Sequence, residues 1–168
     1  LFPGDESQLT PSADGLLLLS LLSGRNPEYL IGKQVRAAPI IRKMRIPHVS
    51  VAYMLIGGDS RSATQRVTGT EPIKSSDLKT IMNTAMAAEQ LGFRAIYLEG
   101  GSGTSQPVRP AAIRMIKKTV SLPLIVGGGL STPARVAAAA RAGASMVVIG
   151  NALESNGFML PVLSKAFY

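Results

Sequence analysis

Tyr97 and Glu99 are the residues of this sequence best suited to acid–base chemistry. They alternate with Ile96 and Leu98 in a short apolar run, and alternate side chains of a strand point to the same side. A carboxylate there can accept a hydroxyl proton or orient a polyol, and a phenol can hold a phosphate oxygen or face a carbocation. The alternative is a structural Glu99 that is buried beside a cation.

Three glycine clusters follow apolar runs, at residues 100–103, 127–129 and 150–151. Glycine lets backbone N–H groups approach an anion closely, and parallel α/β folds bind ligands where their strands end. The last two clusters fall on the last two expected strands, so the pattern predicts a phosphate site at Gly127, Gly128, Gly129, Gly150 and Asn151, with hydroxyls from Ser131 and Thr132. The alternative is that these glycines only form tight turns.

Two further residues, Tyr53 and His48, lie in or beside the preceding apolar run, and one known motif is excluded. Tyr53 lies in the preceding apolar run and is either core or the wall of a substrate pocket, whereas His48 lies at the start of that run and is interpreted as structural. The pair Gly127 and Gly129 lacks the third glycine and the later acidic residue of a dinucleotide-binding fingerprint.

Five apolar runs are typical of strands buried on both faces, since they are continuous rather than alternating. They are residues 16–22, 49–56, 95–98, 122–126 and 146–149. Helical patterns alternate with them at 26–44, 76–92, 110–118, 132–143 and 158–166, and Pro39 is expected to kink or divide the first. This order predicts an α/β fold with a parallel sheet.

An open doubly wound sheet and a (β/α)8 TIM-type barrel both fit this order. Four repeats occupy the 131 positions from Gly15 to Met146, about 33 residues each, whereas a barrel typically has about 250 residues. As a barrel, residues 1–168 would be a single, N-terminally incomplete domain. Its first two strands would be absent, and residues 1–4 would be the tail of another strand. Residues 57–75 show no periodicity and are expected to form a lid.

Composition excludes several classes of protein. The 168 residues include no cysteine and one histidine, which excludes disulfide scaffolds, Cys-ligated metals and multi-histidine sites. No apolar run reaches the roughly 20 residues of a membrane span, and no signal peptide is visible, so we expect a cytoplasmic protein. The net charge of +8 favours an anionic partner, but with no Trp, four Phe and four Tyr base stacking is poorly supplied.

Three ordered motifs resemble one known family. They are Tyr-Leu-Glu-Gly-Gly-Ser-Gly at 97–103, Leu-Ile-Val-Gly-Gly-Gly-Leu at 124–130 and Val-Ile-Gly-Asn at 148–151, preceded by Leu-Phe-Pro-Gly at 1–4. Together they are similar to the geranylgeranylglyceryl phosphate synthase family, which includes bacterial heptaprenylglyceryl phosphate synthases and the moenomycin-pathway phosphoglycerate prenyltransferase. The resemblance covers essentially the whole chain.

The resemblance implies a (β/α)8 barrel that transfers a polyprenyl group from its diphosphate to a hydroxyl of glycerol 1-phosphate or 3-phosphoglycerate. It implies that Tyr97 and Glu99 hold the acceptor's glycerol part. It also implies that the acceptor's phosphate is held by Ser102, Gly127, Gly129, Gly150 and Asn151. Mg²⁺ is implied too, with ligands in the absent N-terminal strands. Ionising an allylic diphosphate needs an apolar trough, and its expected walls are Leu16 to Leu19, Met54, Leu55 and Ile56. The resemblance further implies that the protein forms a homodimer, contacts a membrane peripherally and binds no nucleic acid.

Two other classes of function remain open at this point. Another phosphate-binding barrel enzyme acting on a sugar phosphate would share the glycine loops, but it should carry catalytic side chains at several strand ends. A basic nucleic-acid-binding module would use the positive charge, and its binding would weaken steeply with salt.

Overall fold

The computed structural model describes residues 3–57, 62–155 and 157–168. Its strands form one parallel sheet in the order β1-β2-β4-β5-β6, with the two-residue β3 paired to β2. The strands are β1 (Leu16–Leu21), β2 (His48–Gly57), β3 (Ile73–Lys74), β4 (Ala95–Glu99), β5 (Leu124–Gly127) and β6 (Met146–Val148). All five predicted strands are confirmed. Because the five follow one another without a reversal of order, the sheet is the wall of a barrel rather than a doubly wound sheet.

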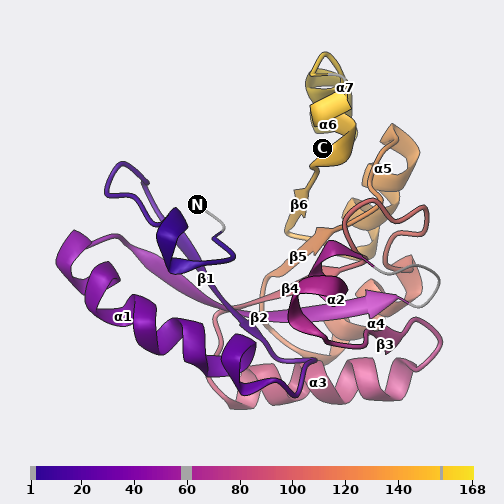
Figure 1. Ribbon diagram of the computed structural model, residues 1–168. Helices are drawn as coiled ribbons and strands as arrows, with labels where there is room; N and C mark the ends of the chain where they lie inside the picture. Colours follow the sequence, from indigo (N-terminus) through magenta and orange to yellow (C-terminus); the bar gives the residue numbers. More distant parts are fainter. Residues whose placement is uncertain (1–2, 58–61, 156) are drawn as a thin grey trace.

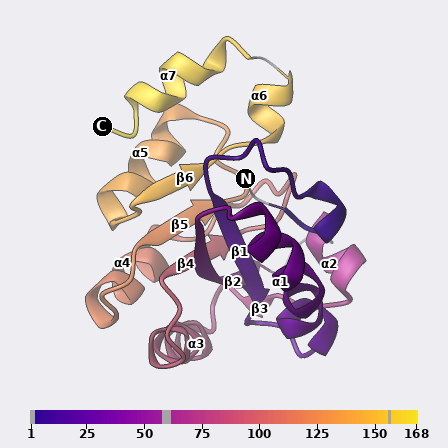
Figure 2. The same cartoon turned by 90° about the vertical axis from the view of Figure 1, so that its left-hand side faces the viewer.

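Helices cover the outer face of this curved wall. They are α1 (Lys33–Met44), α3 (Leu78–Gln90), α4 (Pro110–Thr119), α5 (Pro133–Ala142), α6 (Asn151–Ser155) and α7 (Met159–Lys165). In Figures 1 and 2, α3, α4 and α5 lie in a row around the sheet. Side-chain caps explain where two of these helices begin, since the Asp77 and Thr132 side chains accept the backbone N–H groups of Thr80 and Arg135.

The two faces of the sheet bury different sets of side chains. On the outer face, Met54, Ile56, Ile96 and Leu98 pack against the helices in the main core. On the inner, concave face, a second cluster contains Tyr53, Leu55, Tyr97 and Ile125 with residues of β1. This division follows from the two-residue period of a strand, and it places the chemistry-bearing residues inside the barrel wall.

Several predicted details were wrong. The segment from Gly57 to Ser75 is not a structureless lid throughout, because it contains α2 (Ala63–Thr68) and β3, although residues 58–61 lie outside the described residues. The Ser62 side chain caps α2, and Gly69 ends it with a φ of 62°. Such a six-residue helix is too short to show a periodic pattern.

The helix predicted at 26–44 is also different from expectation. It begins as a π-helical turn, η2 (Glu28–Gly32), and continues as α1 without a break at Pro39. Proline removes one hydrogen bond there but does not divide the helix. At the start of the chain, residues 1–2 lie outside the described residues, and Pro3 and Gly4 belong to no strand.

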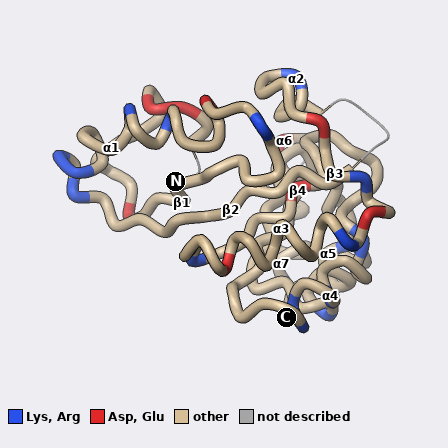
Figure 3. The backbone as a smooth tube through the Cα atoms, turned by 90° about the horizontal axis from the view of Figure 1, so that it is seen from below, with Lys and Arg blue, Asp and Glu red and all other residues tan. Residues whose placement is uncertain are grey.

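Basic residues lie on solvated surfaces, as the charge pattern suggests. Arg42, Lys43 and Arg45 are exposed at the outer end of α1, and Arg114 and Lys117 are exposed on α4. Figure 3 shows these basic groups at two separate places.

Among the described residues, no helix is long and apolar enough to span a bilayer.

Candidate functional site

Strand register brings the predicted catalytic residues together on the concave face. Tyr97 pairs with Tyr53 of β2 and Ile125 of β5, and Glu99 lies one pleat further along, beside Gly127. The rings of Tyr53 and Tyr97 stack with centroids 5.0 Å apart and planes 15° from parallel. The carboxylate therefore lies at the carboxyl end of the sheet, above a pair of stacked phenols.

Glu99 is buried, with 6% of its surface exposed. The Gly101 N–H donates to its Oε1 at 2.6 Å. Burial raises the pKa of Glu99, while hydrogen bonds from Gly101 and from the hydroxyls of Tyr97 and Tyr53 oppose that rise. None of the ion pairs among the described residues involves Glu99. The structural alternative, a carboxylate paired with a cation, therefore has no support in this part of the chain.

The two tyrosines are held in their neutral, hydrogen-bond-donating form. Burial and the neighbouring Glu99 carboxylate raise the pKa of Tyr97, and the same two causes raise the pKa of Tyr53. The Tyr53 hydroxyl also lies 3.4 Å from the Thr64 hydroxyl. Thr64 belongs to α2, so it joins the site through a helix that the sequence did not reveal.

The triple-glycine loop after β5 has a steric reason for its composition. A Cβ at Gly127 would overlap the Tyr97 hydroxyl. At Gly128, φ is 82°, and a Cβ would lie 2.6 Å from Glu99 Oε1 and 2.7 Å from the Gly101 nitrogen. Gly129 also has a positive φ, of 70°. These glycines do more than form a turn, because side chains here would displace the carboxylate and the loop after β4.

Gly150 has a different environment from the triple-glycine loop. A Cβ added there would meet only Glu154 Oε1, at 3.9 Å. The next residue, Asn151, begins the short helix α6 and accepts a hydrogen bond from the Ser102 hydroxyl at 3.2 Å. This contact links the loop after β4 to the loop after β6.

A cavity of about 420 Å³ lies among these loops. Eight of the nine predicted site residues line it: Tyr53, Tyr97, Glu99, Ser102, Gly128, Gly129, Gly150 and Asn151. Gly127 is not part of the lining and lies behind it, against Tyr97 and Glu99. Thr64 and Thr104 also line the cavity, and no motif in the sequence marked them as site residues. We call it the polar cavity because hydroxyl, amide and carboxylate groups lie in it beside apolar side chains, and its one charged side chain, Glu99, is acidic.

A second cavity, of about 310 Å³, adjoins the first. The two share Tyr53 and Thr64. The walls of the second are mostly apolar side chains from β1, α1 and α2: Leu18, Leu19, Leu21, Ala37, Ile41, Ala63 and Val67. Of the apolar walls expected from the sequence, Leu18 and Leu19 lie here. Met54 and Ile56 do not, because they face the helices on the opposite side of the sheet.

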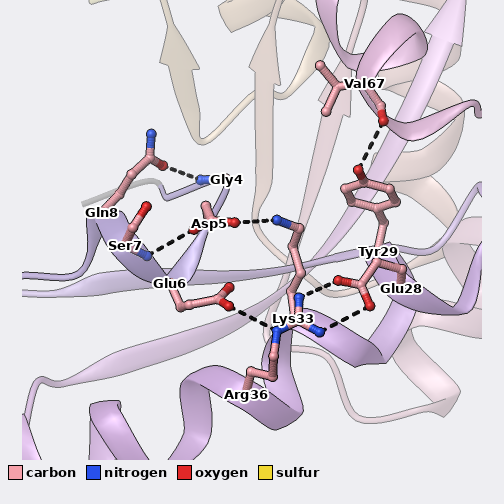
Figure 4. A network of polar contacts seen from close by, with 10 residues as sticks. All are labelled: Gly4, Asp5, Glu6, Ser7, Gln8, Glu28, Tyr29, Lys33, Arg36 and Val67. Atoms are coloured by element: carbon pink, nitrogen blue, oxygen red, sulfur yellow. Dashed lines mark hydrogen bonds and ion pairs between the residues drawn. The ribbon is translucent and has the colours of Figure 1, made fainter.

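Polar contacts fix the walls of this apolar cavity (Figure 4). Asp5 pairs with Lys33 at 2.6 Å, and Arg36 pairs with both Glu6 and Glu28. The hydrogen bond from Lys33 lowers the pKa of Asp5. The Tyr29 hydroxyl donates to the Val67 carbonyl at 2.9 Å, which ties η2 to α2. These ion pairs are partly exposed and stabilise the fold modestly, but they orient three segments around one cavity.

The described residues contain no group of three or more His, Cys, Asp or Glu side chains that could hold a metal ion. Asp5 and Glu6, the acidic residues beside the apolar cavity, are already paired with Lys33 and Arg36. This part of the chain therefore does not fit a Mg²⁺ site.

Comparison with known proteins agrees with this geometry. A curated geranylgeranylglyceryl phosphate synthase from Zunongwangia profunda is 45% identical over 94% of this chain and 68% of its own length. The one from Flavobacterium johnsoniae is 47% identical over 93% of this chain and 64% of its own length. This chain thus spans about two thirds of the length of these relatives.

A solved structure gives the same result in three dimensions. The (S)-3-O-geranylgeranylglyceryl phosphate synthase of Thermoplasma acidophilum, crystallised with its substrate sn-glycerol-1-phosphate, superposes with a TM-score of 0.87 at 35% identity. The match covers 98% of this chain and 65% of that chain. The model of the PcrB family matches residues 1–166. The resemblance found in the three motifs is confirmed, and this chain belongs to the PcrB family.

Proposed function

We propose that this protein transfers a polyprenyl group from its diphosphate to a hydroxyl of a phosphorylated three-carbon acceptor, forming an ether. The observation that carries the proposal is the pair of adjoining cavities. One is polar and contains a buried carboxylate and glycine loops, and the other is apolar and shares Tyr53 and Thr64 with it. Two substrates of opposite character can therefore meet at one place. The relatives' names and the glycerol 1-phosphate bound to the archaeal enzyme support this assignment.

The acceptor's phosphate binds at the loops after β5 and β6. Gly128 and Gly129 have positive φ values, which are typical of loops whose N–H groups converge on an anion. The Asn151 amide adds side-chain N–H donors at the same cavity, and the Ser102 hydroxyl, which donates to Asn151 Oδ1, holds that amide in place. With its phosphate there, the glycerol part of the acceptor extends toward Tyr97 and Glu99.

Glu99 accepts the proton of the attacking hydroxyl. The acceptor oxygen forms a bond to the first carbon of the prenyl group, the bond from that carbon to the diphosphate oxygen breaks, and diphosphate leaves with the electron pair. Burial raises the pKa of Glu99, which makes its carboxylate a stronger base. The neighbouring rings of Tyr97 and Tyr53 offer π-faces to positive charge developing on the allylic carbon.

The prenyl chain lies in the apolar cavity between β1, α1 and α2. Leu18, Leu19 and Val67 are among its walls, and apolar walls also exclude water from a reactive carbocation. α2 forms one side of this cavity through Ala63, Thr64 and Val67, so α2 has the position expected of a lid.

Four further expectations stay predictions of the family resemblance: Mg²⁺, a homodimer, peripheral membrane contact and a cytoplasmic location.

The test is product analysis by mass spectrometry. The protein is offered prenyl diphosphates of several lengths, each with glycerol 1-phosphate or with 3-phosphoglycerate. We expect one ether product whose mass identifies both chain length and acceptor. Binding of either acceptor without ether formation from any pair, in the presence of Mg²⁺, would refute prenyl transfer and favour another phosphate-binding barrel enzyme.

A further inference from the structure

The polar cavity has a deficit of positive charge. Its described lining includes one charged side chain, Glu99, which is an acid. A phosphate monoester carries a charge of about −1.5 to −2 near neutral pH. Backbone N–H groups supply only partial positive charges, so a cation behind the phosphate loops would strengthen the binding of such an anion.

Arg135, in the first turn of α5, is the cation in contact with the loop after β5. Its Nη1 donates to the Gly129 carbonyl at 2.9 Å and to the Ser131 hydroxyl at 3.2 Å. The Ser131 N–H donates to the same carbonyl at 3.0 Å. Arg135 takes part in none of the ion pairs among the described residues, so within that part of the chain no carboxylate neutralises it.

These contacts determine the orientation of one peptide group. None of the described peptide bonds is cis, and in a trans peptide the N–H points opposite to the C=O. Two donors hold the Gly129 carbonyl toward α5, so the N–H of Leu130 points away from α5. Gly129, Leu130 and Ser131 all line the polar cavity. A flip of this peptide would instead turn a carbonyl oxygen toward a bound phosphate.

We propose that Arg135 is a positioning residue for the acceptor phosphate. It locks the Gly129–Leu130 peptide with its N–H available to the anion, and it places a full positive charge behind the loop. The proposal rests on the proposed function for the identity of the acceptor, but the ligand chemistry that it requires is simply a phosphate group. Arg135 acts through the loop and takes no part in proton transfer.

The test compares Arg135→Met with Arg141→Met. Both residues lie on α5, but Arg141 is exposed in the last turn and touches no part of the phosphate loops among its described contacts. Calorimetry gives the Kd of inorganic phosphate and of glycerol 1-phosphate, and kinetics give the KM of each substrate. We expect Arg135→Met to raise both Kd values and the acceptor KM about 10-fold, as for a lost charge-assisted interaction. Arg141→Met should change them less than about 2-fold.

Other measurements separate this role from a merely structural one. In Arg135→Met the KM of prenyl diphosphate should stay within about 2-fold of the wild-type value, and raising the salt concentration should weaken phosphate binding less than in the wild type. Arg135→Lys, which keeps the charge, should recover part of the affinity. Unchanged phosphate affinity in Arg135→Met, or equal loss of both substrates, overturns the proposal. If Arg135→Met does not fold, Arg135→Lys provides the test. Phosphate affinity near the wild-type value at low salt supports the proposal, and no measurable phosphate binding overturns it.

Failure of prenyl transfer gives a different result. A wild-type protein that binds phosphate but forms no ether, with the Arg135 effect intact, refutes the transfer reaction and supports the role of Arg135. A wild-type protein that binds no phosphate overturns both proposals.

Discussion

Replacing Glu99 by Gln tests the chemistry most directly. The substitution keeps the shape of the side chain, and its carbonyl oxygen can still accept the Gly101 N–H bond that Oε1 accepts at 2.6 Å. What it removes is the negative charge and the ability to take a proton. Because Glu99 is 6% exposed, water cannot readily replace the carboxylate.

The size of the effect follows from the loss of a general base in a buried site. A positioned acid–base group contributes about 10²- to 10⁴-fold to a rate, so we expect kcat/KM to fall about 10²-fold, or about 2.7 kcal/mol of transition-state stabilisation. The KM of the acceptor should rise modestly, since the carboxylate also orients the polyol. The affinity for prenyl diphosphate should barely change, because the apolar cavity does not include Glu99.

The pH dependence of stability gives an independent reading of the same residue. Burial raises the pKa of Glu99 above its ordinary value of 4.5. The stability that depends on its protonated form is therefore present below that ordinary value and is lost as pH rises through the raised one. We expect Glu99→Gln to become more stable than the wild type as pH rises from about 4 to 7, measured by urea unfolding at both pH values.

Glu89→Gln is the matched control. Glu89 lies at the end of α3, where the Ser121 hydroxyl and N–H donate to it and lower its pKa. Glu89→Gln should leave turnover unchanged. It should be less stable than the wild type at pH values above the ordinary carboxyl pKa, which is the opposite of the stability change expected for Glu99→Gln. Near wild-type turnover in Glu99→Gln would refute the reasoning and reduce Glu99 to a structural carboxylate.

Three further results are expected. Gly128→Ala should weaken acceptor binding far more than Gly69→Ala, because both have positive φ but only at Gly128 does a Cβ collide with its neighbours; equal effects on acceptor binding, measured by calorimetry, would contradict this. Ala63→Phe narrows the apolar cavity, so kinetics should show a higher prenyl diphosphate KM and an unchanged acceptor KM. Hydrogen exchange in α2 (Ala63–Thr68) should slow when prenyl diphosphate is added, and unchanged exchange would count against a closing role.

Much of the fold could be predicted because its signals are local. Continuous apolar runs identify buried strands, and caps such as Thr132 and stops such as Gly143 identify helix ends. The helix α2 was not predicted, because its six residues make fewer than two turns and cannot show a repeated apolar pattern. The expected apolar walls at Met54 and Ile56 were wrong for another reason. A continuous run shows that a strand is buried but not which face each side chain takes.

For the site, too, some features follow from local sequence and others only from the tertiary structure. Tyr97 and Glu99 could be placed on one face from the sequence alone, because the period of a strand is a property of its own backbone. Which glycines leave no room for a side chain depended on the tertiary structure, since Gly127 and Gly128 face atoms of β4 and its loop, whereas Gly150 faces nearly open space. Thr64 and Arg135 also joined the site only on folding. Their neighbours come from other elements of the chain, and no local pattern records such contacts.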